Sequence, residues 1–156
     1  MSQPHPTNPG EPYDRVAVVG AGAWGTALAL VAAANVRQVL LWAREPDVVA
    51  GIHGSRENRR FLPDVRLPEN VEPVSDLGAA VGCEAVLLVS PAQHIRETAE
   101  ALRRAIRPAQ PIVLCAKGIE HGTGKLLTEV LADALPDGEG DRSESAASWL
   151  LPPPIG

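Results

Sequence analysis

The stretch VAVVGAGAWGTALAL, residues 16–30, decides the fold of this chain. It begins with four small apolar residues that are typical of a buried strand and continues with a helical pattern of alanine and leucine. Gly20, Gly22 and Gly25 lie at the change between the two patterns and fit the spacing G-x-G-x-x-G. In that context Gly20 permits a tight turn, Gly22 lets the backbone approach a pyrophosphate, and Gly25 lets the helix pack closely on the strand.

Two other interpretations of this stretch are a membrane span and a core helix with incidental glycines. The uncharged stretch between Arg15 and Arg37 is long enough to cross a membrane as a helix. However, the glycines mark a change from strand to helix, and no other segment indicates a membrane protein. We therefore predict a dinucleotide-binding turn, in which the partial positive charge and unpaired N–H groups of the helix N-terminus hold phosphate.

Composition limits the class of protein. The 156 residues are 45% hydrophobic and 21% charged, which is typical of one globular domain. The net charge of −5 opposes nucleic-acid binding, which needs a basic face. Cys83 and Cys115 lie in or beside apolar runs, so we expect buried thiols, and no metal-ligand spacing occurs. The first residues lack the features of a secretion signal, which favours the cytoplasm.

The rest of the chain alternates strand and helix patterns. We expect strands at 15–20, 38–43, 71–74, 84–90 and 111–116, and helices at 23–35, 45–52, 75–83, 91–107 and 122–135, with a polar loop at 53–70. Apolar strands that alternate with helices predict a doubly wound α/β fold, a Rossmann-type parallel sheet covered on both faces. The predicted domain spans residues 14–136, between a disordered tail at 1–13 and an irregular tail at 137–156.

The end of the second predicted strand bears on cofactor choice. An acidic residue there would bind the ribose hydroxyls of NAD, but LLWARE places Ala43 and Arg44 at this point. Arg44 can form charge-assisted hydrogen bonds with a 2′-phosphate, or it can be an ordinary solvated surface residue. The sequence therefore favours NADP(H), or the use of both NADP(H) and NAD(H).

Five segments together resemble the N-terminal half of NAD(P)-dependent glycerol-3-phosphate dehydrogenase: GAGAWGTALA, LLWARE, NRRFLPDVRLPENV, VLLVSPAQHIRE and AKGIEHGTGKLLTEVL. The resemblance covers about residues 15–136. It implies reduction of dihydroxyacetone phosphate to sn-glycerol 3-phosphate, which feeds phospholipid synthesis. It also implies no metal. The residues it places at the cofactor are Gly20, Gly22, Ala23, Trp24, Gly25, Arg44, Phe61, Pro91 and Lys117.

The resemblance implies particular roles for several of these residues. Ala23 and Trp24 would contact the cofactor beside the pyrophosphate, although family members often have Ser where Ala23 stands. Pro91 would belong to a cofactor-contacting turn, and Lys117 would reach both nicotinamide and substrate. Phe61 would either cover the cofactor or pack locally. A lysine beyond the carboxyl end of a strand lies in the crevice where such sheets bind ligands.

The family continues with a helical domain that supplies a proton-donating lysine, and residues 137–156 do not resemble that continuation. We expect this tail to be truncated or out of frame, and the isolated chain to bind cofactor weakly and to turn over poorly or not at all. A homodimer or a separate helical chain is a further expectation. The alternatives are a non-catalytic dinucleotide-binding module and a related dehydrogenase that acts on a different ketone or alcohol.

Overall fold

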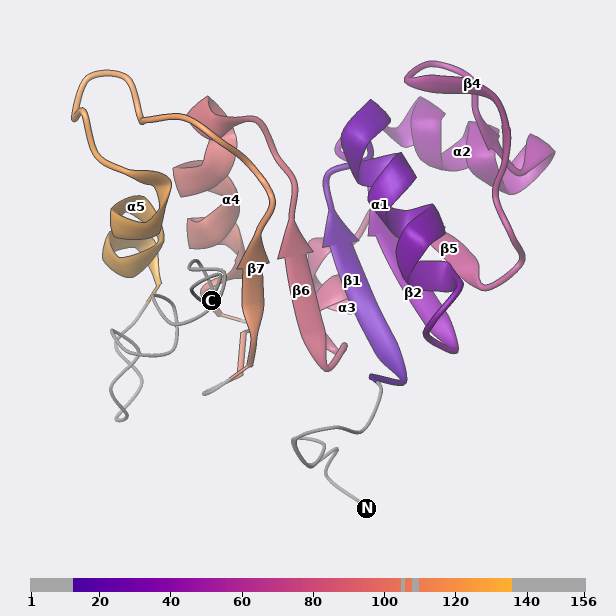
Figure 1. The fold of residues 1–156 in the computed structure, drawn as a ribbon, viewed down its shortest axis with the longest axis horizontal. Helices are drawn as coiled ribbons and strands as arrows, with labels where there is room; N and C mark the ends of the chain where they lie inside the picture. Colours follow the sequence, from indigo (N-terminus) through magenta and orange to yellow (C-terminus); the bar gives the residue numbers. More distant parts are fainter. Residues whose placement is uncertain (1–12, 105, 108–109, 136–156) are drawn as a thin grey trace, which may run out of the picture.

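A five-stranded parallel sheet forms the centre of the molecule (Figure 1). The computed structural model describes residues 13–104, 106–107 and 110–135. The sheet has the order β5-β2-β1-β6-β7, with bounds β1 (Arg15–Val19), β2 (Gln38–Trp42), β5 (Val71–Val74), β6 (Ala85–Leu88) and β7 (Ile112–Leu114). The strand order reverses between β1 and β6, and ligands of such sheets bind outside the carboxyl ends of the strands at this point.

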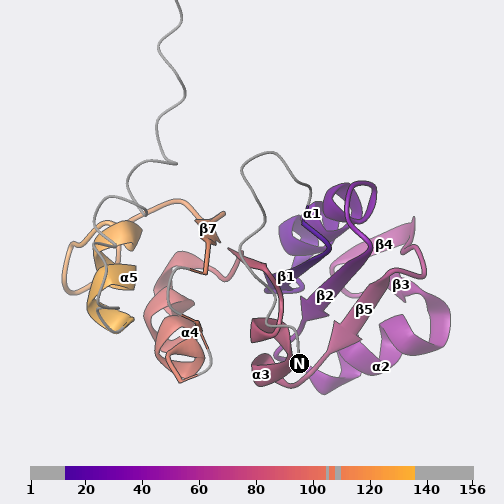
Figure 2. The same cartoon turned by 90° about the horizontal axis from the view of Figure 1, so that it is seen from below.

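Helices cover both faces of the sheet. Successive residues of a strand point to opposite faces, so Val16 and Val18 join one core cluster, while Ala17 and Val19 join the other. The first cluster lies under α1 (Ala23–Ala33) and α2 (Pro46–Ser55), and the second lies under α3 (Leu77–Val81), α4 (Ile95–Leu102) and α5 (Leu127–Ala134). Figure 2 shows α1 and α3 on opposite sides of the sheet. The predicted doubly wound fold is confirmed.

The predicted polar loop at 53–70 is wrong in part, because it contains a two-stranded antiparallel hairpin. The hairpin consists of β3 (Glu57–Asn58) and β4 (Leu62–Arg66). Two apolar residues of the segment explain its order: Leu67 is fully buried, and Phe61 packs against the first core cluster. In addition, the Arg56 side chain donates hydrogen bonds to the carbonyls of Pro68 and Val71.

The two helices predicted last in the chain are shorter than expected. The segment predicted at 91–107 begins with a 3-10 turn, η1 (Ala92–His94), and its α-helix ends at Leu102. The segment predicted at 122–135 becomes helical only at Leu127. Gly122 and Gly124 have φ angles of 85° and 69°, which are incompatible with a right-handed helix, so this part is a loop.

Several expectations concern single features or the ends of the chain. Cys83 and Cys115 are free, and burial raises the pKa of both thiols, but only Cys83 is fully buried. Within the described ranges, no helix is long and apolar enough to cross a membrane, and no group of His, Cys, Asp and Glu is arranged to hold a metal ion. The predicted tails at 1–13 and 137–156 lie outside the described residues, except for Tyr13.

Candidate functional site

The glycine turn, residues 20–25, joins β1 to α1 at the point where the strand order reverses. Gly20 has a φ of 122°, and a Cβ built on it would lie 3.0 Å from the backbone carbon of Val89. The backbone N–H of Gly20 also donates a hydrogen bond to the carbonyl of Trp42 at 3.1 Å. The positive φ angle and the nearby backbone of Val89, directly after β6, therefore both exclude a side chain at Gly20, as expected for a tight turn.

The other two glycines of the turn have opposite surroundings. A Cβ on Gly25 would lie 1.7 Å from the carbonyl oxygen of Gly20, so close packing of α1 on the turn requires glycine here, as predicted. Gly22 caps α1 with an ordinary φ of −69°, and a Cβ on it would meet nothing within 4 Å. The fold itself does not require glycine at this position, and the open space fits the approach of a ligand.

The start of α1 is suited to an anion. No side chain caps this helix, and its first turn contains no acidic residue. The positive end of the helix dipole is therefore not neutralised by the helix's own side chains. Ala23 and Trp24 form the first helical residues, and Trp24 is 61% exposed. An exposed indole beside an uncapped helix N-terminus offers a flat apolar surface next to a place suited to an anion.

Asn58 and Thr26 contact the turn from within the protein, and the sequence analysis did not identify them. The Asn58 Nδ2 group donates hydrogen bonds to the carbonyl of Ala21 and to Thr26 Oγ1, both at 2.8 Å. Asn58 is 2% exposed and Thr26 is 1% exposed. The one signal available in the sequence was a polar residue at the start of NRRFLP, a segment with several apolar residues.

Arg44 lies beyond the carboxyl end of β2 and contacts Glu97 of α4. Its Nη2 atom lies 2.6 Å from Oε1 of Glu97, and Nδ1 of His94 lies 3.6 Å from Oε2 of the same carboxylate. The hydrogen bond from Arg44 is the largest cause that lowers the pKa of Glu97. Both charged side chains of the Arg44–Glu97 pair are more than half exposed, so solvent screens this ion pair and it adds little to stability.

Lys117 lies in the lysine loop, residues 117–125, which follows β7 and is tied to the segment after β6. Gln93 forms two hydrogen bonds with this loop: its Nε2 donates to the carbonyl of Ile119 at 3.0 Å, and its Oε1 accepts from the N–H of His121 at 2.8 Å. Lys117 itself is exposed. The structure therefore brings the Pro91 turn and the Lys117 segment together, as expected for neighbouring parallel strands.

A second contact fixes the same loop to α4. Arg96 donates from Nε and Nη2 to the two carboxylate oxygens of Glu120, at 2.8 and 2.9 Å. These hydrogen bonds, with one from Thr123, lower the pKa of Glu120 to about 2. Lys125 also lies in this loop, although the helix predicted at 122–135 would have included it, and its Nζ lies 2.5 Å from Oδ2 of Asp133.

Phe61 and Pro91 are the last of the predicted cofactor residues. Phe61 packs against the first core cluster, and the guanidinium of Arg60 lies 5.1 Å from the centre of its ring. Local packing of Phe61, one of its two predicted roles, is therefore present. Pro91 is exposed and caps the 3-10 turn η1 directly after β6. The cofactor contacts of both residues stay predictions.

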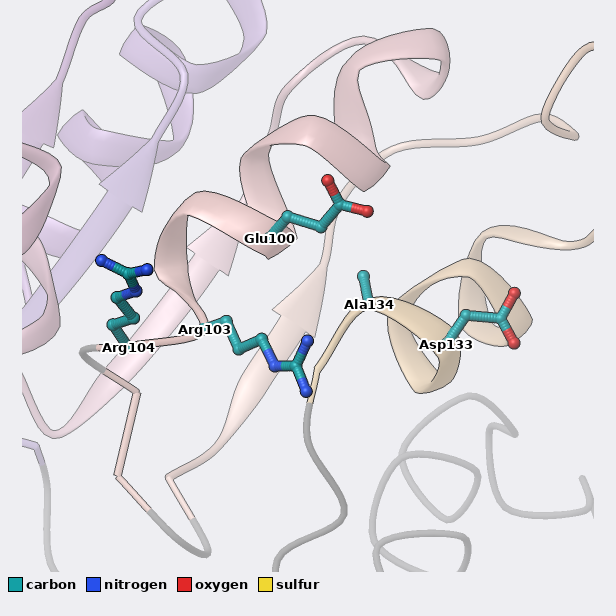
Figure 3. A pocket seen from close by; sticks show the side chains of 5 residues that line it. All are labelled: Glu100, Arg103, Arg104, Asp133 and Ala134. Carbon is teal, nitrogen blue, oxygen red and sulfur yellow. The ribbon is translucent and has the colours of Figure 1, made fainter.

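A pocket between α4 and α5 is separate from the glycine turn. Figure 3 shows its five lining residues: Glu100 near the end of α4, Arg103 and Arg104 directly after α4, and Asp133 and Ala134 at the end of α5. Each helix starts near the carboxyl ends of the strands and runs back toward the opposite end of the sheet (Figure 1). None of the five lining residues belongs to the glycine turn or to the predicted cofactor residues, so this pocket is not the predicted cofactor site.

The fold and the glycine turn define a protein of the Rossmann class, in which ligands bind beyond the carboxyl ends of the strands where the strand order reverses, here β1 and β6. Residues 15–142 match the family model described as NAD-dependent glycerol-3-phosphate dehydrogenase N-terminus, and the chain belongs to this family.

Curated relatives and solved structures agree with this assignment. The chain is 51% identical over 124 residues to glycerol-3-phosphate dehydrogenase (NAD(P)+) of Parvibaculum lavamentivorans, covering 80% of this chain and 37% of the relative. It is 47% identical over 124 residues to the corresponding protein of Caulobacter vibrioides, with 80% and 38% covered. The crystal structure of glycerol-3-phosphate dehydrogenase from Coxiella burnetii superposes with a TM-score of 0.74 at 35% identity, covering 80% of this chain and 38% of that one. The chain thus spans well under half the length of these relatives.

Proposed function

We propose that this chain is the cofactor-binding half of a glycerol-3-phosphate dehydrogenase that uses NADP(H) or NAD(H). The observation that carries the proposal is the glycine turn at the point where the strand order reverses. Neighbouring backbone leaves no room for a side chain at Gly20 and Gly25, whereas Gly22 faces open space. Such an arrangement fits a backbone built to approach a pyrophosphate. Family membership supports the same cofactor class.

Individual residues take roles from their positions. Ala23 and Trp24 contact the cofactor beside the pyrophosphate, and Arg44 binds its adenosine end. Phe61 and Pro91 border the same crevice. The nicotinamide, when bound, supplies a hydride to the ketone carbon of dihydroxyacetone phosphate.

Lys117 serves the substrate side of the site. Its ammonium group stabilises the substrate phosphate or the negative charge that develops on the carbonyl oxygen during reduction. The bonds from Gln93 and Arg96 to the lysine loop support this role, because they limit where Lys117 can lie. The product is sn-glycerol 3-phosphate, a precursor for glycerophospholipid synthesis.

The same proposal bears on the partners of the chain and on its location in the cell. Val113 on β7, Ile119 in the lysine loop and Leu126 directly before α5 are about half exposed, and a helical domain or a second copy of the chain would cover them. Two free cysteines suit a reducing compartment, in agreement with a cytoplasmic location.

Titration with NADH and NADPH, followed by tryptophan fluorescence, tests the proposal because Trp24 is exposed beside the turn. Dihydroxyacetone phosphate and unphosphorylated dihydroxyacetone are then compared as second ligands. Binding of a dinucleotide followed by preference for the phosphate ester supports the dehydrogenase assignment. Dinucleotide binding without either ketone supports the alternative, a non-catalytic module. We expect slow or no oxidation of NADPH by dihydroxyacetone phosphate with the 156-residue polypeptide alone.

A further inference from the structure

We infer that Asn58 is a positioning residue, which holds the glycine turn in the conformation that receives the dinucleotide pyrophosphate. The inference rests on the proposed function and assigns a role to a residue outside the glycine motif. Asn58 reaches the turn from the hairpin, 37 residues away along the chain from Ala21. Its side chain is almost completely buried, so it cannot exchange its partners for water.

The amide of Asn58 uses both ends. Nδ2 donates at 2.8 Å to the carbonyl of Ala21 and at 2.8 Å to Thr26 Oγ1, while Oδ1 accepts from the N–H of Phe61 at 3.3 Å. An amide has two N–H donors, and both have acceptors here. The two ends of the amide are therefore not interchangeable, and the side chain joins the hairpin to the turn in one orientation.

These hydrogen bonds fix the peptide groups on both sides of Gly22. The carbonyl of Ala21 is directed toward Asn58, and in a planar trans peptide the N–H of Gly22 then points the opposite way. The carbonyl of Gly22 accepts from both the backbone N–H and Oγ1 of Thr26, at 2.9 and 2.8 Å. The turn is thus organised before a ligand arrives, which reduces the entropy lost on binding.

The chain contains a matched control at the other end of the same helix. The Nδ2 group of Asn70 donates to the carbonyls of Ala33 and Val36, at 2.9 and 3.1 Å. Asn70 therefore makes the same kind of contact with the C-terminal end of α1, away from the glycine turn. A side chain that only stabilises α1 would act equally from either end, whereas a positioning residue acts only at the turn.

The experiment compares Asn58→Ala with Asn70→Ala in the full chain. Two quantities are measured below the melting temperature of both variants: the Kd for NADH and the hydrogen-exchange rates of the backbone amides in residues 21–25. We expect Asn58→Ala to raise the Kd about 10-fold or more and to accelerate exchange in the turn, because the hydrogen bonds from Asn58 to Ala21 and Thr26 are lost. Asn70→Ala should leave both quantities within about 2-fold of the unmodified protein.

If Asn58→Ala does not fold, Thr26→Val replaces it in the experiment. Thr26→Val removes one hydrogen-bond acceptor of Asn58 and keeps the side-chain volume nearly constant. It should raise the Kd by about 3- to 10-fold. Equal Kd values for Asn58→Ala and Asn70→Ala, or unchanged exchange in the turn, would overturn the role of Asn58. Failure of the unmodified protein to bind NADH and NADPH would overturn the proposed function instead, and the exchange rates would still decide whether Asn58 holds the turn.

Discussion

Gly25→Ala and Gly22→Ala should separate the packing role of the glycine turn from its binding role. The new methyl carbon at residue 25 would lie 1.7 Å from the carbonyl oxygen of Gly20, whereas ordinary contact begins at 3.4 Å. The backbone must therefore move by about 1.7 Å to restore ordinary contact, because the nearest atoms belong to the Gly20 backbone and not to a flexible side chain. At residue 22 the same methyl group meets nothing within 4 Å.

The two substitutions should differ strongly in stability. Overpacking of a rigid core costs about 1–3 kcal/mol, and we expect Gly25→Ala to reach the upper end of this range, about 3 kcal/mol. That loss is a large part of the roughly 5–15 kcal/mol that stabilises a domain, and it lowers Tm by roughly 10 °C. For Gly22→Ala a small capping loss is offset by reduced freedom of the unfolded chain, so Tm should stay within about 2 °C.

Thermal denaturation followed by circular dichroism, and NADH titration at 15 °C, measure both effects. Gly22→Ala should weaken NADH binding by about 10-fold or more, because its methyl group enters the space left for the pyrophosphate. A Tm for Gly25→Ala equal to that of the unmodified protein would refute the packing role. Unchanged NADH affinity in Gly22→Ala would refute the binding role.

Three further predictions concern charged residues. Glu97→Gln removes the ion pair with Arg44 and should tighten NADPH binding by about 3- to 10-fold, while NADH binding stays unchanged. The control Glu100→Gln, on the same helix, should leave the ratio of the Kd for NADPH to the Kd for NADH unaltered. The pKa of Glu120 lies at about 2, below its ordinary value of 4.5, so its stabilisation is complete above pH 4.5 and is lost as the pH falls toward 2. The Tm difference between the unmodified protein and Glu120→Gln should therefore shrink between pH 6 and pH 3, and a constant difference would contradict the assignment. Lys117→Met should weaken binding of dihydroxyacetone phosphate to the NADH complex by about 10-fold, measured by calorimetry; equal substrate affinity would remove Lys117 from the substrate site.

Much of the fold could be predicted from local patterns. Continuous apolar runs such as residues 16–19 indicate strands buried on both faces, and their alternation with helices indicates a parallel sheet. The functions of Gly20 and Gly25 within the fold could be predicted too, because a glycine spacing directly between a strand and a helix has few structural solutions. The predicted start of the last helix was wrong, since Gly122 and Gly124 adopt backbone angles that periodicity does not reveal.

The side-chain partners of the site depended on tertiary structure. Asn58 is 37 residues away from Ala21 along the chain, and a polar residue at the start of NRRFLP does not by itself reveal which distant backbone group it will bind. The same holds for Arg44 and Glu97, which lie 53 residues apart and meet only because β2 and α4 converge at one end of the sheet.

The sequence by itself therefore determined the order of elements, the parallel sheet, the glycine turn and the family to which the chain belongs. Those properties depend on hydrophobic periodicity and on local backbone freedom, which neighbouring residues encode. Only the tertiary structure decided which buried amide orients the turn, which carboxylate holds Arg44 and where Gln93 anchors the lysine loop. Hydrogen bonds between distant segments depend on how the layers pack, and that geometry exists only once the chain has folded.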